Sequence, residues 1–173
     1  MLKKIIKNYI MTNIKKYIIR DASKDDMHAV LDLIKELAIF ENEPNAVIID
    51  AEYLKAEGFK EKPSFKIFVA EMNNKIIGMT LFYPRFSTWK GVSIHLEDLI
   101  VKKEYRNLGI GKALYKHFLE YANSKKVKRV EWAVLDWNIN AINFYKKSGA
   151  TVFDDWKIVQ MNEQQLSKFI NKK

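Results

Sequence analysis

One stretch decides the fold of this chain: Leu99-Ile100-Val101-Lys102-Lys103-Glu104-Tyr105-Arg106-Asn107-Leu108-Gly109-Ile110-Gly111-Lys112-Ala113-Leu114. It begins with apolar residues typical of a buried strand and ends in the apolar spacing of a helix. Between them lies a basic turn, in which Gly109 and Gly111 let the backbone come close to a ligand. The first N–H groups of a helix lack internal partners and lie at the positive end of its dipole, so the turn predicts an anion site.

The spacing of this turn separates three phosphate-binding motifs. A P-loop needs Ser or Thr after its lysine, but Ala113 follows Lys112, and Arg106 stands where the first glycine is required. A dinucleotide fingerprint needs a third glycine, and Leu114 occupies that position. What remains is Arg-x-x-Gly-x-Gly, from Arg106 to Gly111, with positive side chains suited to a pyrophosphate.

A second motif follows as Val134-Leu135-Asp136-Trp137-Asn138-Ile139-Asn140-Ala141-Ile142-Asn143-Phe144-Tyr145-Lys146-Lys147-Ser148-Gly149-Ala150. Asn138 is predicted to cap a helix that runs over 141–147 and ends at Gly149. Tyr145 lies in that helix, and by itself it would also suit a core tyrosine. Together the two motifs resemble those of the GNAT superfamily of N-acetyltransferases.

Further segments make the resemblance more specific, and it covers residues 17 to about 161. The chain resembles the diamine acetyltransferase branch, which comprises spermidine/spermine and thialysine acetyltransferases. The segments that carry it are Ile34-Lys35-Glu36-Leu37-Ala38, Phe40-Glu41, Ser87-Thr88-Trp89-Lys90-Gly91, Leu96-Glu97-Asp98 and Ala133-Val134-Leu135-Asp136-Trp137-Asn138. Ser87 replaces an acidic residue of the polyamine enzymes, and Asp154-Asp155-Trp156 is one residue shorter than the family's acidic loop. A lysine-like amine is therefore favoured over spermidine.

The resemblance implies a fold, a co-substrate and a set of site residues. The fold is an α/β (α+β) GNAT fold, with a mixed, largely antiparallel sheet splayed around an acetyl-CoA cleft and flanked by helices. Acetyl-CoA would contact Leu99, Ile100, Val101, Arg106, Asn107, Leu108, Gly109, Ile110, Gly111, Lys112, Asn138, Ile139, Asn140 and Ala141. The amine site would comprise Phe40, Glu41, Trp89, Glu97, Asp98, Trp132, Asp155 and Trp156. Tyr145 and Glu97 would be catalytic, and the family forms homodimers.

The pattern of elements agrees with an α/β protein. Strands are predicted over 17–20, 65–71, 76–83, 92–101, 129–135 and 156–161, and Asn73-Asn74-Lys75 predicts a hairpin turn. Helices are predicted after Ser23, which is followed by Asp26 in a capping-box variant, and over 51–58, 108–122, 141–147 and 163–170. Asp50 would cap the second helix and Gly58 would end it. We expect a tail over 1–14 and one acetyltransferase domain over 15–173.

The residue types suggest a direct transfer of the acetyl group. An amine of this kind, with a pKa near ~10, arrives protonated and must lose its proton before it attacks. Glu97, beside Asp98, would take that proton, although a strand carboxylate paired with a lysine is the alternative. His95 is a weaker candidate base. A backbone N–H of the strand over 99–101 would stabilise the oxyanion, and Tyr145 would protonate the leaving thiolate.

Composition excludes several other classes. The 173 residues contain no cysteine, which excludes disulfides, zinc–thiolate sites and a cysteine nucleophile. The spacing of the three histidines does not suggest a metal pair, so no metal is expected. No apolar run is long enough to span a membrane, and no signal peptide is evident. We therefore expect a cytoplasmic protein without a membrane partner. The net charge of +9 is spread over scattered lysines. The alternatives are a protein or peptide amine acetyltransferase, a non-catalytic CoA-binding partner protein, and a basic nucleic-acid-binding module.

Overall fold

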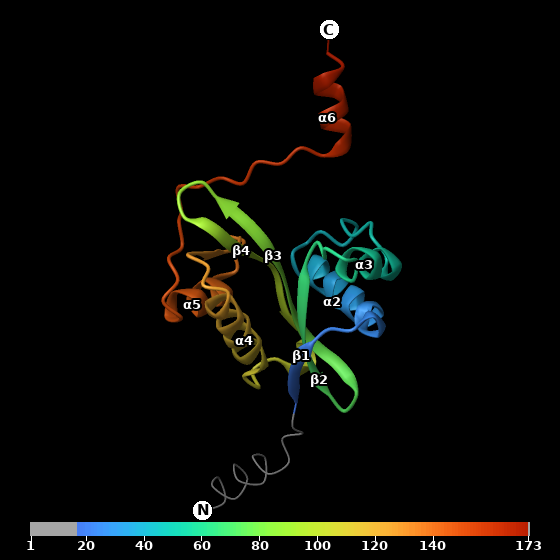
Figure 1. Ribbon diagram of the computed structural model, residues 1–173, viewed down its shortest axis with the longest axis vertical. Helices are drawn as coiled ribbons and strands as arrows, with labels where there is room; N and C mark the ends of the chain where they lie inside the picture. Colours follow the sequence, from blue (N-terminus) through green and yellow to red (C-terminus); the bar gives the residue numbers. More distant parts are fainter. Residues whose placement is uncertain (1–16, 173) are drawn as a thin grey trace, which may run out of the picture. The chain divides into compact units, whose positions relative to one another are not determined.

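The computed structural model describes residues 17–172, which form two compact units that divide between Ala133 and Val134. The first unit is built on a five-stranded sheet with the order β1-β2-β3-β4-β5 (Figure 1). The first four strands are antiparallel neighbours, whereas β5 runs parallel to β4. The strands are β1 (Ile18–Asp21), β2 (Lys66–Met72), β3 (Lys75–Ser87), β4 (Gly91–Val101) and β5 (Val130–Glu131). The predicted mixed, largely antiparallel sheet is thus confirmed.

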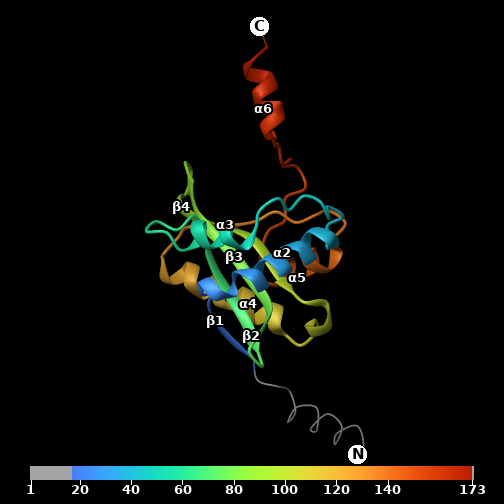
Figure 2. The same ribbon diagram turned by 90° about the vertical axis from the view of Figure 1, so that its right-hand side faces the viewer.

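Helices cover both faces of this sheet. Helices α2 (Met27–Phe40) and α3 (Ala51–Gly58) lie on one face and α4 (Ile110–Ser124) on the other (Figures 1 and 2). Short 3-10 turns, η1 (Lys24–Asp26) and η2 (Lys103–Tyr105), precede α2 and α4. The core on the α2 side includes Val30, Leu33, Leu54, Val69 and Met79. On the α4 side Phe68, Phe82, Phe118 and Tyr121 form a cluster of ring contacts.

Local capping chemistry positions α2 and α3 as predicted. The Ser23 backbone N–H donates to Asp26 Oδ2 over 2.7 Å, and Arg20 pairs with the same carboxylate, which lowers the pKa of Asp26 to about 2. Asp50 Oδ1 accepts from the Tyr53 N–H at 2.7 Å and begins α3. Helix α3 ends at Gly58 as predicted, but the φ of this glycine is not positive, so the expected left-handed glycine cap was wrong. A Cβ there would lie 2.8 Å from the Phe65 ring, so close packing requires this glycine.

The predicted hairpin between β2 and β3 is confirmed. Asn73 and Asn74 have φ values of 51° and 58°, as a turn of the I′ type requires. Gly78, in the next strand, permits another close approach, because a Cβ there would lie 2.8 Å from the Ile100 carbonyl oxygen. The turn thus sets β2 beside β3, and Gly78 lets β3 and β4 approach closely near Ile100.

Strand β5 is shorter than the predicted strand over 129–135. It pairs with β4 only at Ile94↔Val130 and His95↔Glu131. Beyond His95, β4 has a β-bulge in its pairing with β3, after which the β3–β4 pairing resumes at Asp98 and continues to Val101. Within residues 17–172, no strand pairs with the Leu96–Val101 half of β4 on the side away from β3.

The second unit contains α5 (Ile139–Lys147) and α6 (Glu163–Ile170), both predicted. Gly149 has a φ of 92°, the left-handed conformation expected after α5. The strand predicted over 156–161 is absent: these residues are exposed, have no regular secondary structure and have no strand to pair with among those described. An apolar segment forms a strand only where a partner supplies its hydrogen bonds. Among residues 17–172, no helix of either unit is long and apolar enough to cross a bilayer.

Candidate active site

A β-bulge in β4 marks the candidate active site. In the pairing between β3 and β4, Asp98 of β4 lies opposite Leu81 of β3. The next pair is Leu96 with Phe82, so β4 has one additional residue between them, Glu97. Side chains of a regular strand alternate between the two faces, and an additional residue interrupts this alternation.

The bulge places neighbouring carboxylates on one face of the sheet. Leu81, opposite Asp98, belongs to the core cluster that α2 covers, and registered side chains share a face. Glu97 accepts a hydrogen bond from Tyr83 Oη at 2.9 Å, and Tyr83 packs against the same cluster. Glu97 and Asp98 therefore both lie on the α2 side, an arrangement that a regular strand would forbid.

A third carboxylate completes an acidic cluster, which we define as Glu41, Glu97 and Asp98. Glu41 follows the last residue of α2. Burial, together with the charges of Glu97 and Glu41, raises the pKa of Asp98 to about 7. Burial and the charge of Glu97 also raise the pKa of Glu41. Neighbouring carboxylates repel one another when they are ionised, and a bound cation lowers this electrostatic repulsion. The cluster therefore suits a protonated amine.

Tyr83 and His95 contact the cluster from neighbouring strands, and sequence reasoning did not identify Tyr83. The two residues are direct partners in the β3–β4 register, and their rings stack at 5.2 Å with an interplanar angle of 28°. His95 Nε2 lies 3.6 Å from Glu97 Oε2. Burial and the hydrogen bond to Glu97 raise the pKa of Tyr83 to about 12, so the phenol remains a donor at neutral pH.

The predicted anion turn joins β4 to α4. Gly109 adopts a φ of 80° as the N-cap of α4, a conformation that favours glycine. No side chain caps this helix, and none caps α2, whereas Asp50, Asn138 and Asn162 accept hydrogen bonds at the starts of α3, α5 and α6. The first N–H groups of α4 thus have no side-chain acceptor at the cap, which agrees with the predicted anion site.

Space around the turn also fits a ligand. A Cβ on Gly109 would meet nothing within 4 Å. On Gly111 it would make only an ordinary contact, 3.7 Å from Val101 Cγ2. Neither close packing nor a positive φ thus accounts for Gly111, and the approach of an anion to the helix start at this glycine stays a prediction.

Arg106, predicted to pair with pyrophosphate, is held by the protein itself. Its Nε donates to the Val101 carbonyl oxygen over 2.9 Å, and its guanidinium lies 5.6 Å from the centre of the Phe40 ring. Glu36 Oε1 lies 3.6 Å from Arg106 Nη2 and also accepts from the Lys103 N–H at 3.0 Å. Arg106 and Glu36 thus connect α2 to the anion turn, and Glu36 is a second residue that the motif search missed.

Two tryptophans predicted for the amine site lie elsewhere in the first unit. Trp89 is 78% exposed, in a turn whose Trp89 and Lys90 N–H groups both donate to Ser87 Oγ over 3.2 Å. Trp132 makes an edge contact with Tyr115 of α4, at 5.8 Å, on the face opposite the acidic cluster. The part of these tryptophans in amine binding stays a prediction.

The remaining predicted residues belong to the second unit. Asn138 caps α5 as expected, with Oδ1 accepting from the Ala141 N–H at 3.2 Å. Tyr145 is buried, and its ring contacts Phe144. Asp155 and Trp156 lie in the exposed extended segment before α6. Their catalytic and binding roles stay predictions.

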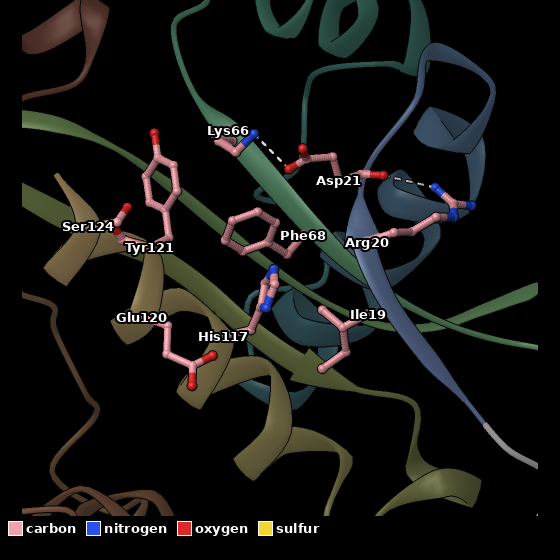
Figure 3. A pocket seen from close by; sticks show the side chains of 9 residues that line it. All are labelled: Ile19, Arg20, Asp21, Lys66, Phe68, His117, Glu120, Tyr121 and Ser124. Carbon is pink, nitrogen blue, oxygen red and sulfur yellow. Dashed lines mark hydrogen bonds and ion pairs between the residues drawn. The ribbon is translucent and has the colours of Figure 1, made fainter.

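A separate cavity of about 500 Å³ lies between α4 and the β1–β2 edge (Figure 3). Lys66 Nζ pairs there with Asp21 Oδ1 at 2.6 Å and lies over the Phe68 and Tyr121 rings. Its lining includes none of the predicted site residues. Within residues 17–172, no group of three or more His, Cys, Asp or Glu side chains could hold a metal ion.

Known proteins resemble this chain over most of its length. The model of the acetyltransferase (GNAT) family matches residues 27–150. A thialysine N-epsilon-acetyltransferase of Bos taurus is 37% identical over 165 residues, covering 89% of this chain and 97% of that protein. An enzyme of the same name from Caenorhabditis elegans is 34% identical, covering 90% and 98%. A solved integron cassette protein of V. cholerae superposes with a TM-score of 0.75 at 23% identity, covering 90% and 98%, and thus shares the fold.

Proposed function

Because this chain belongs to the acetyltransferase (GNAT) family and is an N-acetyltransferase, we propose that it acetylates the primary amine of a small cationic substrate, a lysine-like amine or a polyamine. The observation that carries the proposal is the acidic cluster of Glu41, Glu97 and Asp98 at the bulge. The relatives named for thialysine support an amine of the lysine type.

Acetyl-CoA supplies the acetyl group as a thioester, and residues of both motifs would hold it. The uncapped start of α4 and the open space at Gly111 fit its pyrophosphate. The backbone of the Leu96–Val101 half of β4, which has no strand partner on one side within residues 17–172, offers N–H groups to the acyl oxygen and the pantetheine arm. The residues proposed for acetyl-CoA are Leu99, Ile100, Val101, Arg106, Asn107, Leu108, Gly109, Ile110, Gly111, Lys112, Asn138, Ile139, Asn140 and Ala141.

The acidic cluster would bind and deprotonate the amine. An ammonium group between Glu97 and Asp98 relieves their mutual repulsion, which favours binding. Glu97, half exposed at the bulge, would take the amine proton directly or through a water molecule. An N–H from the strand over 99–101 would stabilise the oxyanion, and Tyr145 would protonate the departing thiolate.

We infer a direct transfer within a ternary complex. The sequence contains no cysteine to form an acyl-enzyme. The amine is made nucleophilic by losing a proton to a carboxylate, so a covalent intermediate is not needed.

We further propose that residues 15–173 act as one acetyltransferase domain, in a cytoplasmic homodimer that needs no metal, membrane or nucleic acid. The absence of cysteine suits a reducing compartment. The dimer is supported by large apolar side chains that the described chain leaves exposed in the second unit, among them Phe153, Trp156, Ile158, Val159, Leu166, Phe169 and Ile170. Light scattering coupled to size-exclusion chromatography tests it, and a monomer at micromolar concentration would contradict it.

The first experiment measures thiol release from acetyl-CoA with thialysine, lysine, spermidine, putrescine and a lysine peptide. Turnover with a free amine, lost in Glu97→Gln, is the expected result. Turnover with the peptide alone would identify a protein acetyltransferase instead. No turnover, together with acetyl-CoA binding by calorimetry, would contradict the proposed activity and leave a CoA-binding role.

A further inference from the structure

One oxygen of the Glu97 carboxylate is enclosed by two aromatic rings. Tyr83 Oη donates to Glu97 Oε2 at 2.9 Å, and His95 Nε2 lies 3.6 Å from the same oxygen. Both contacts use Oε2, so Oε1 lies outside them. The two rings stack on each other as direct cross-strand partners, which fixes their orientation relative to Glu97.

The surroundings of His95 indicate which ring nitrogen carries the proton. His95 Nδ1 is buried and has no hydrogen-bond partner among residues 17–172. Burying an N–H group without an acceptor costs more free energy than burying an unprotonated ring nitrogen. The proton therefore belongs on Nε2, which faces Glu97, and Nδ1 is unprotonated. On the other side of His95, Glu131 of β5 pairs with Arg85 at 2.7 Å and Arg129 at 2.9 Å. The two guanidinium groups balance the charge of Glu131, and no hydrogen bond joins Glu131 to His95 Nδ1, although both Glu131 Oε1 and His95 Nδ1 are buried without a hydrogen-bond partner among residues 17–172.

Glu97 needs such support because of its place in the strand. It is the additional residue of the bulge, its side chain is 50% exposed, and its flexible side chain loses rotamer entropy when fixed. A general base must lie within hydrogen-bond reach of the proton it removes. A base held in advance by its neighbours meets this requirement more often than a freely rotating one.

We propose that Tyr83 and His95 are positioning residues that hold Glu97 through Oε2 and so present Oε1 to the substrate ammonium. This proposal rests on the proposed function of the same site. Tyr83 makes the direct hydrogen bond. His95 lies beyond hydrogen-bond distance and acts through the ring stack and through its Nε2–H, which approaches Oε2 by a small movement.

Four substitutions separate positioning from general structural support. Tyr83→Phe keeps the ring stack but removes the donor, and it should lower kcat/KM for the amine about ten-fold with the KM for acetyl-CoA unchanged. His95→Phe keeps the stack but removes Nε2–H, with an expected loss of about five-fold. His95→Gln also loses the ring stack, but its amide can donate to Glu97, and His95→Leu, which lacks both the stack and the donor, is its matched control. His95→Gln should retain more activity than His95→Leu, and equal losses in these two variants would overturn the assigned role of Nε2–H.

A double-mutant cycle with Glu97→Gln tests whether both residues act through Glu97. In that background, where the base is absent, Tyr83→Phe should change the residual rate less than two-fold. A ten-fold loss in both backgrounds would overturn the proposal, because it would show that Tyr83 acts independently of Glu97. Circular dichroism and urea unfolding verify that each variant folds.

A spectroscopic readout keeps the proposal testable even if no amine in the panel is acetylated. Long-range 1H–15N spectra report histidine tautomers, and the signal missing from His95→Gln identifies His95. The expected result is an Nε2–H tautomer whose Nε2 resonance moves in Glu97→Gln. An Nδ1–H tautomer, or a resonance insensitive to Glu97→Gln, would overturn the positioning role, whereas absent turnover alone would contradict only the proposed activity.

Discussion

Replacing Asp98 with asparagine should stabilise the protein, and more strongly as pH rises. The pKa of Asp98 is raised from 3.8 to about 7, mainly by burial. Each unit corresponds to 1.36 kcal/mol, so the ionised carboxylate costs the folded state up to about 4 kcal/mol, less what residual solvent contact screens. The folded state binds this proton more tightly than the unfolded state, and stability is therefore lost as pH rises from about 4 to about 7. Asp98→Asn cannot ionise and avoids that loss.

Urea unfolding at pH 5, 6, 7 and 8 measures the effect. The free energy of unfolding of Asp98→Asn, minus that of the unmodified protein, should grow by about 2–3 kcal/mol between pH 5 and pH 8. Titrating groups far from Asp98 are common to both proteins and cancel in this difference, whereas Glu41 and Glu97 interact with Asp98 and contribute to it. Asp32→Asn, at an exposed position of α2, is the matched control and should show a difference that hardly depends on pH.

A constant difference for Asp98→Asn across this range would refute the reasoning, because Asp98 would then not titrate in the folded state near neutral pH. Amine acetylation should fall in the same variant, since the amine site loses a carboxylate. Such a gain in stability with a loss of activity is expected where a site keeps charges that the fold does not favour.

Three other predictions follow from the site. Tyr145→Phe should lower turnover at least ~10-fold while calorimetry shows unchanged acetyl-CoA binding, and an unchanged rate would remove Tyr145 from the mechanism. Glu36→Gln keeps an acceptor for the Lys103 N–H but loses its charge beside Arg106, so the KM for acetyl-CoA should rise about 3–10-fold without a change in amine KM. Gly111→Ala should leave the melting temperature unchanged or raise it, because alanine is the better helix former. The same variant should bind acetyl-CoA about ten-fold more weakly, and equal binding would mean that no ligand approaches that position.

The sequence predicted those features that depend on neighbouring residues alone. The capping residues Ser23, Asp50 and Asn138 were identified because a cap and its helix lie within four positions of each other. The hairpin at Asn73 and Asn74 follows from the ease with which asparagine adopts a positive φ. The glycine turn before α4 belongs to the same class of local signals.

The features that sequence reasoning missed depend on pairings between distant segments. Nothing near Glu97 in the sequence reveals the bulge, which exists only relative to Leu81 and Phe82 on the opposite strand. Tyr83 lies 14 residues from the carboxylate that it contacts, and no motif connects them. The strand expected over 156–161 is rich in apolar residues, but apolar composition does not supply a partner strand. Arg106 was correctly placed in the turn, yet its contacts with α2 could not be read from the motif.

The bulge in β4 also determines how this site could be moved to another protein. Substitution alone cannot recreate two adjacent carboxylates on one side of a sheet, since in an unbroken strand the second would enter the opposite layer. A designer would have to insert one residue opposite an intact neighbouring strand as a bulge, so that the residues beyond it keep their partners and their faces, as Asp98 to Val101 do here. Conversely, deleting Glu97 would restore regular alternation, with Leu96 opposite Phe82 and Asp98 opposite Leu81 as consecutive residues. The strand could then keep its pairing with β3 while the site loses its base.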